Sequence, residues 1–236
     1  NLPAKRERLL FVGNHGIWGL DVAVLLHTLY EEEGIFPRCF GSHAWFAAPG
    51  VNEVIQAMIG AVDGTERNCD LLMHAGHNCL VYPGGEREAW KKSSDKKYSL
   101  IWGESRGFAR MALRHQYTII PVATVGTEDI FKVVADFPLS KFLRLGGMIP
   151  APSSKKLAGN ALMEGSTLPL IVPRVDKLQR LYFKLGKPIE ARPSTFIAGD
   201  YTEQVRSNPL GPRDGALRAP GFENFEPDEE DVCTLR

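Results

Sequence analysis

A histidine and an aspartate near the start of the chain could together move a proton. His15 and Asp21 follow the short apolar run 9–12 (LLFV) and the turn residues Gly13 and Asn14. An imidazole at such a position can take the proton of an attacking hydroxyl, and a carboxylate that folds back on it would fix the ring tautomer and stabilise the imidazolium. The alternative interpretation is a turn histidine and a helix-capping aspartate without a catalytic role.

A glycine-rich block after a second apolar run could bind a ligand. Residues 82–88 (YPGGERE) follow the run 79–81. Gly84 and Gly85 would let the backbone approach a ligand closely, and Arg87 offers a rigid fork of donors for a phosphate or a carbonyl. The alternative is a tight turn with solvated charges.

Two further motifs are weaker candidates. Residues 103–107 (GESRG) match the GxSxG nucleophile elbow, with Ser105 as the nucleophile. His115 follows about ten residues later on an expected helix, roughly 15 Å away at 1.5 Å per residue, which is too far for a Ser–His pair. We therefore expect Ser105 to be a helix N-cap. His74 and His77 lack a third ligand, so no metal site is predicted.

The elements that would position these residues alternate between strand and helix. Apolar runs predict strands at 9–12, 79–82 and 118–122, and helical periodicity predicts helices over 21–33, 51–59, 68–75 and 106–115. Asp21 is expected to cap the first helix, and residues 91–97 to form an exposed lysine-rich loop. This alternation predicts an α/β fold with a mainly parallel sheet flanked by helices. His15 and Gly84 would then lie at the carboxyl ends of strands, where ligands bind.

The composition restricts the class of protein. The chain has 236 residues, 44% of them hydrophobic, and Lys+Arg 28 balances Asp+Glu 28. This supports a sizeable core and argues against nucleic-acid binding. No apolar run reaches the roughly 18 residues of a membrane-spanning helix. We expect one domain over 1–205 and a disordered, acidic, Pro/Gly-rich tail over 206–236.

Taken together, the blocks resemble the glycerolipid acyltransferase superfamily, and most of all its diacylglycerol-acyltransferase-type branch, which includes the phytyl ester synthases. Residues 14–21 resemble the family's His–Asp box, and residues 83–88 resemble the branch's PGGxRE block. The likeness continues through 101–109, 119–122 and 184–189. The spacing from His15 to Asp21 is one residue longer than in the lysophosphatidate acyltransferases, and Gly84 replaces their glutamate, which favours a neutral alcohol over a phosphorylated acceptor.

The resemblance implies an O-acyltransferase. It would move a fatty acyl group from acyl-CoA or acyl carrier protein to a lipid alcohol such as diacylglycerol or phytol, without a metal or other cofactor. His15 would be the general base and Asp21 its partner. Substrate contacts would come from Asn14, Gly16, Gly84, Gly85, Arg87 and Glu88. Among these, Arg87 would hold a phosphate or polarise the acyl carbonyl, and Glu88 would set the orientation of Arg87.

The resemblance also implies a membrane surface as a partner, in the endoplasmic reticulum or a plastid. The sequence begins at Asn1, so we expect it to lack the family's N-terminal membrane anchor. Two alternatives stay open: a serine lipid esterase that uses Ser105, and a catalytically degenerate lipid-binding member of the family.

Overall fold

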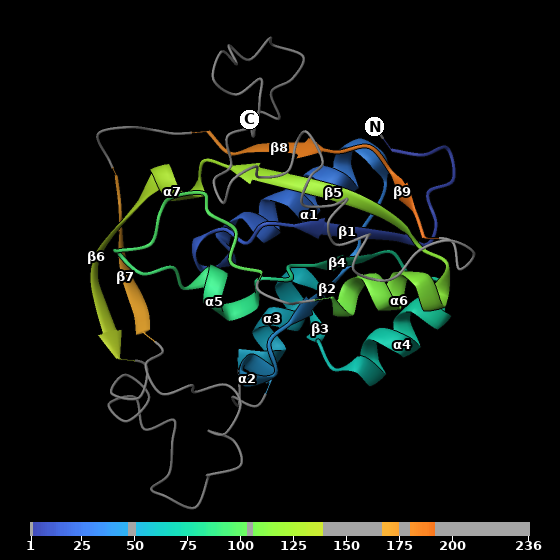
Figure 1. Ribbon diagram of the computed structural model, residues 1–236, viewed down its shortest axis with the longest axis horizontal. Helices are drawn as coiled ribbons and strands as arrows, with labels where there is room; N and C mark the ends of the chain where they lie inside the picture. The colour runs from blue at the N-terminus through green and yellow to red at the C-terminus, as the bar shows by residue number, and fades with distance from the viewer. Residues whose placement is uncertain (1, 47–50, 103–105, 139–166, 175–179, 192–236) are drawn as a thin grey trace, which may run out of the picture.

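A mainly parallel β-sheet forms the centre of the protein (Figure 1). The computed structural model describes residues 2–46, 51–102, 106–138, 167–174 and 180–191. Within these ranges the strands lie in the order β3-β2-β4-β1-β5-β8, and β9 also pairs with β5. The bounds of the sheet strands are β1 Leu9–Gly13, β2 Arg38–Gly41, β3 Val62–Asp63, β4 Cys79–Val81, β5 Thr118–Val125, β8 Tyr182–Leu185 and β9 Ile189–Glu190.

Strand β1 lies between two parallel neighbours. Phe11 is opposite Leu80 of β4 on one side and Ile120 of β5 on the other. Strands β2 and β3 continue the parallel arrangement beyond β4, and β8 and β9 run antiparallel to β5. A strand covered on both faces and both edges explains the continuous apolar run at 9–12. The predicted mainly parallel sheet is confirmed.

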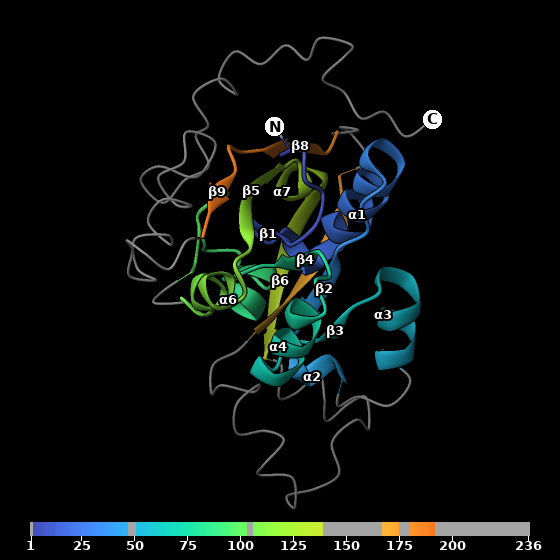
Figure 2. The same ribbon diagram turned by 90° about the vertical axis from the view of Figure 1, so that its right-hand side faces the viewer.

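Helices cover both faces of this sheet (Figure 2). Leu9 and Phe11 pack in one core cluster with α1, and Leu10 and Val12 pack in a second cluster with α4 and α6. This division follows from the alternation of side chains along a strand. The helix bounds are η1 Ile17–Gly19, α1 Leu20–Glu33, α2 His43–Phe46, α3 Val51–Ile59, α4 Glu66–His74, α5 Gly85–Ala89, α6 Gly107–His115 and α7 Thr127–Ile130.

The start of α1 differs from the prediction that Asp21 caps it. The N-cap is Gly19, and Asp21 lies in the first turn with a completely buried side chain. Between the end of β1 and α1 the chain forms the short 3-10 helix η1, in which Trp18 has a left-handed φ of 59°. The insertion of η1 moves the helix start, so the carboxylate points inward instead of toward the free backbone amides.

A two-stranded hairpin outside the main sheet was not predicted. Strands β6 (Phe131–Pro138) and β7 (Thr167–Pro173) pair antiparallel, with a register shift between Val133 and Ala135. The hairpin lies to the side of the sheet (Figure 1). The Trp18 indole Nε1 donates to the carbonyl oxygen of Pro169 at 3.1 Å, so the hairpin contacts η1.

Other predicted elements agree with the structure within a few residues, with one exception in the lysine-rich segment 91–97. Lys91 is buried, with 5% of its surface exposed, instead of lying in a solvated loop.

Two predictions fall outside the described residues: Ser105 as a helix N-cap and the disordered tail over 206–236. The N-cap of α6 is Arg106. None of the helices in the described ranges is long and apolar enough to cross a membrane.

Candidate active site

The imidazole of His15 is held at the carboxyl end of β1. Its Nδ1 lies 2.9 Å from the carbonyl oxygen of Gly16. A carbonyl oxygen can only accept, so Nδ1 carries the proton and Nε2 is left with its lone pair. The ring also packs on Tyr82, with ring centroids 4.7 Å apart. Burial, with the charge of Lys91 as a smaller cause, lowers the pKa of His15 to about 4 against the opposing effect of the Gly16 hydrogen bond. The imidazole is therefore neutral at physiological pH.

The expected His15–Asp21 hydrogen bond is not formed. Within the described part of the chain, neither carboxylate oxygen of Asp21 has a hydrogen-bond partner, and the Gly16 carbonyl takes the tautomer-fixing role predicted for Asp21. The carboxylate lies under the turn, because a Cβ built on Gly16 would be 2.3 Å from Asp21 Oδ1. Burial raises the pKa of Asp21 to about 7, opposed by the nearby backbone amides of Asp21 and Gly16 and helped by the charge of Glu88.

The Asn14 side chain fixes the turn to the neighbouring strand. Its Nδ2 donates to the Thr124 carbonyl oxygen at 2.9 Å, and its Oδ1 accepts from the Thr124 amide at 2.8 Å. The two bonds extend the contact between β1 and β5 beyond the last paired residues, Gly13 and Val122. These bonds give Asn14 a role in shaping the turn, and the substrate contact assigned to it stays a prediction. Gly16 likewise shapes the turn, as the absence of room for a Cβ shows.

Glu88 supports His15 rather than Arg87, which corrects the predicted pairing. Its completely buried carboxylate accepts from the backbone amide of His15 at 2.9 Å and from that of Ile101 at 3.2 Å. Burial raises the pKa of Glu88, while the His15 amide and the charge of Lys91 oppose the shift. The carboxylate thus joins the turn that carries His15 to the segment before α6.

The glycine–arginine block is held by contacts within the protein, with open space beside Gly85. A Cβ on Gly84 would lie 2.5 Å from Glu88 Oε2, so Gly84 is required by the inward fold of Glu88. Gly85 opens α5. The Arg87 guanidinium binds Asp95 through two hydrogen bonds of 2.8 and 3.1 Å, which raises the pKa of Arg87. Gly84 and Glu88 thus pack against each other and Arg87 pairs with Asp95, and the substrate contacts predicted for Gly84, Gly85, Arg87 and Glu88 stay predictions.

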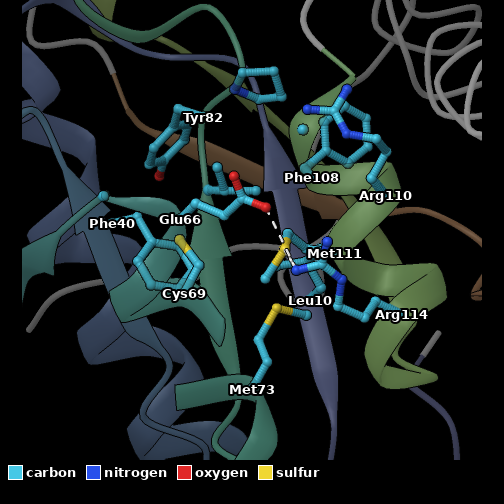
Figure 3. Close-up of a pocket in the computed structure, with 14 residues that line it drawn as sticks. Leu10, Phe40, Glu66, Cys69, Met73, Tyr82, Phe108, Arg110, Met111 and Arg114 are labelled. Atoms are coloured by element: carbon cyan, nitrogen blue, oxygen red, sulfur yellow. Dashed lines mark hydrogen bonds and ion pairs between the residues drawn. The ribbon is translucent and has the colours of Figure 1, made fainter. Parts of the chain in front are cut away.

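An apolar cavity of about 320 Å³ opens on the face of the sheet that α4 and α6 cover (Figure 3). Such a volume lies at the lower end of the range for ligand pockets. Tyr82, whose ring contacts His15, and Pro83 line it. Its apolar lining is Leu10, Phe40, Cys69, Met73, Val81, Phe108 and Met111, and its charged lining is Glu66, Arg110 and Arg114. Among the described residues His15 does not line the cavity, and the Tyr82 ring that contacts it packs in the core cluster on the α1 side of the sheet.

Comparison with known proteins decides the family. A family model described as diacylglycerol acyltransferase matches residues 1–148. The chain belongs to the diacylglycerol acyltransferase family.

Two curated relatives agree with this assignment. Phytyl ester synthase 1, chloroplastic, of Arabidopsis thaliana is 30% identical over 212 residues, which cover 83% of this chain and 29% of that protein. The Homo sapiens "DGAT1/2-independent enzyme synthesizing storage lipids" is 28% identical over 134 residues, covering 57% of this chain and 40% of that protein. The chain therefore spans less than half the length of either relative. The resemblance stated from the sequence is confirmed.

The chain is also similar to a solved structure. It is the 1-acyl-sn-glycerophosphate acyltransferase PlsC of Thermotoga maritima, with a TM-score of 0.48 and 16% identity, covering 87% of this chain and 64% of that chain.

In this diacylglycerol acyltransferase family member, sequence reasoning missed a buried ion pair beside the site. Lys91 Nζ lies 2.5 Å from Glu128 Oε1, and each side chain is 6% exposed. The second Glu128 oxygen accepts from the Tyr98 amide at 2.9 Å. The pair holds the Lys91 ammonium near the site, where its charge lowers the pKa of His15 and opposes the rise in the pKa of Glu88. The one available signal was the position of Lys91 directly after Ala89 and Trp90, two apolar residues that are also buried.

Proposed function

We propose that this chain transfers a fatty acyl group from a thioester to a lipid alcohol, with neutral His15 as the general base. The observation that carries the proposal is the bond from His15 Nδ1 to the Gly16 carbonyl, which leaves Nε2 as a proton acceptor at the carboxyl end of β1. Family membership supports the reaction class. A lone pair held in fixed orientation is what general-base catalysis requires, and it contributes roughly 10²–10⁴ in rate.

The reaction follows from this arrangement. Nε2 removes the proton of the alcohol while the alcohol oxygen attacks the thioester carbonyl carbon. The C–S bond then breaks, and the leaving thiolate takes the proton back from the imidazolium. The ester and the free thiol are the products, and the imidazole is neutral again. The buried negative charge of ionised Asp21 would stabilise the transient imidazolium through space.

The cavity suits the acyl chain of the donor. Its apolar lining would accept the chain. Arg110 and Arg114 lie together at one side of it (Figure 3), and Arg114 is paired with Glu66 and Asp70. The charge of Arg110 suits the phosphates of acyl-CoA or of an acyl carrier protein. The names of the relatives favour phytol or a storage-lipid precursor such as diacylglycerol as the acceptor, and one of them is chloroplastic. We extend these properties, with location at a plastid or endoplasmic reticulum membrane, to this chain as part of the proposal.

An acceptor panel tests the proposal. The purified chain is incubated with palmitoyl-CoA or palmitoyl-acyl carrier protein and, in turn, diacylglycerol, phytol and lysophosphatidate. Mass spectrometry then measures the ester formed. We expect ester with a neutral alcohol and much less with lysophosphatidate. A folded protein that forms no ester with any pair contradicts the proposal and favours a lipid-binding role.

A further inference from the structure

The β6–β7 hairpin exposes an unusual amount of apolar surface. The exposed fractions are 47% for Val134, 50% for Phe137, 47% for Leu170 and 40% for Val172. A ribbon of two strands has little core of its own, and contiguous exposed apolar residues commonly mark a binding surface.

The strand register places these residues together. Leu170 is opposite Ala135 and Val172 is opposite Lys132. Directly paired residues share a face, and alternate residues along a strand do so too, so Phe137 joins Leu170 and Val172. We call this the outer hairpin face. Lys132 is the charged residue that the described part of this face carries.

The opposite face of the hairpin contacts the candidate active site. Asp136 accepts from Ser93 Oγ at 2.5 Å, and Ser93 lies in the segment that follows buried Lys91. The Pro169 carbonyl accepts from the indole of Trp18, three residues after His15. The hairpin is thus fixed to the catalytic turn by polar contacts while its apolar face points away from it.

We propose that the outer hairpin face docks on a lipid bilayer. This inference rests on the proposed function, because a water-insoluble alcohol must pass from a bilayer to His15. An apolar face that carries a lysine suits insertion at an anionic membrane surface. The Asp136 carboxylate, which such a surface would repel, is instead bound to Ser93.

Vesicle sedimentation tests the inference without any substrate. The full 236-residue chain is mixed with phosphatidylcholine vesicles, with and without phosphatidylserine. We expect binding that increases with phosphatidylserine. The double variant Phe137→Ser/Leu170→Ser should lose about tenfold or more in affinity, since each substitution removes apolar surface from the bilayer. The matched control, Val54→Ser/Met58→Ser, removes exposed apolar residues from α3 and should bind like the unmodified chain.

Three results would overturn the inference: no vesicle binding by the unmodified chain, equal binding by the hairpin variant, or an equal loss in the α3 control. Light scattering provides a fourth check, because a dimer that only the hairpin variant dissociates would assign the face to a second copy. Circular dichroism verifies that both variants fold. The vesicle assay needs no catalysis, so a failed acyl-transfer assay leaves it informative.

Discussion

At the scale of single residues, the site depends on two buried groups with opposite pKa shifts. Burial lowers the pKa of His15 to about 4 and raises that of Asp21 to about 7. Burial disfavours the charged form of each group, which is why a base and an acid move in opposite directions. At neutral pH the imidazole is therefore uncharged, with Nε2 unprotonated, while the carboxylate is close to its own titration point.

The tautomer of His15 can be observed directly by ¹⁵N NMR of imidazole-labelled protein. We expect the Nδ1-protonated neutral form to persist well below pH 6.5, down toward about 4, because burial opposes its protonation. Spectra of His15→Ala identify the His15 signals. An Nε2-protonated ring, or a ring that is already doubly protonated at pH 6.5, would contradict the assignment of Nε2 as the base.

Asp21 should make stability depend on pH. Its folded-state pKa of about 7 lies above the unfolded value of 3.8, so the native state holds a proton that the unfolded chain releases between these values. The free energy of unfolding therefore falls as pH rises through 7, by up to about 1.4 kcal/mol for each pKa unit. Thermal unfolding at pH 5 and pH 8 should show that Asp21→Asn removes much of this difference. A variant that keeps the whole difference would show that Asp21 is not its source.

At the scale of elements, Glu88 connects α5, the turn after β1 and the segment before α6. Glu88→Gln leaves one acceptor oxygen for two backbone amides, so we expect kcat to fall on the order of 10²-fold through misplacement of His15. The KM for the acyl donor should change only a few-fold. We expect the free energy of unfolding of Glu88→Gln to be about 1–3 kcal/mol lower than that of the unmodified chain.

The control for this prediction is Glu86→Gln on the same helix. Glu86 accepts from the Ser42 hydroxyl and does not contact His15. A loss of kcat in this variant equal to that in Glu88→Gln would assign the effect to general disturbance of α5.

The elements also show what a sequence can predict. The strands at 9–12 and 79–82 were predictable because a buried parallel strand is a local apolar run, whatever its partners are. The burial of Lys91 was not, because it depends on Glu128, 37 positions away. The orientation of His15 also escaped prediction. The family box names the histidine and the aspartate, but the backbone of η1 decides that the ring meets the Gly16 carbonyl.

At the scale of the whole molecule, the proposed base and the proposed acyl cavity are built on the same central strands. The end of β1 carries His15, and Leu10 of β1 and Val81 of β4 line the cavity together with residues of α4 and α6 (Figure 3). The arrangement predicts that the size of the cavity limits the length of the acyl chain.

Met111→Trp should reduce that space. We expect kcat/KM for a palmitoyl donor to fall about tenfold or more, with a butyryl donor little affected, because the larger ring occupies the volume of the longer chain. Overpacking should also lower the unfolding free energy by about 1–3 kcal/mol. Leu71→Trp on the exposed side of α4 is the control. Equal losses for both donors would show that the cavity does not hold the acyl chain.

The most direct test of the account is the rate of acyl transfer by His15→Ala compared with the unmodified chain, with His27→Ala on α1 as the matched control. We predict that kcat falls by roughly 10²–10⁴ in His15→Ala while its circular dichroism is unchanged, and that His27→Ala retains its activity. Transfer by folded His15→Ala at the rate of the unmodified chain would contradict the account.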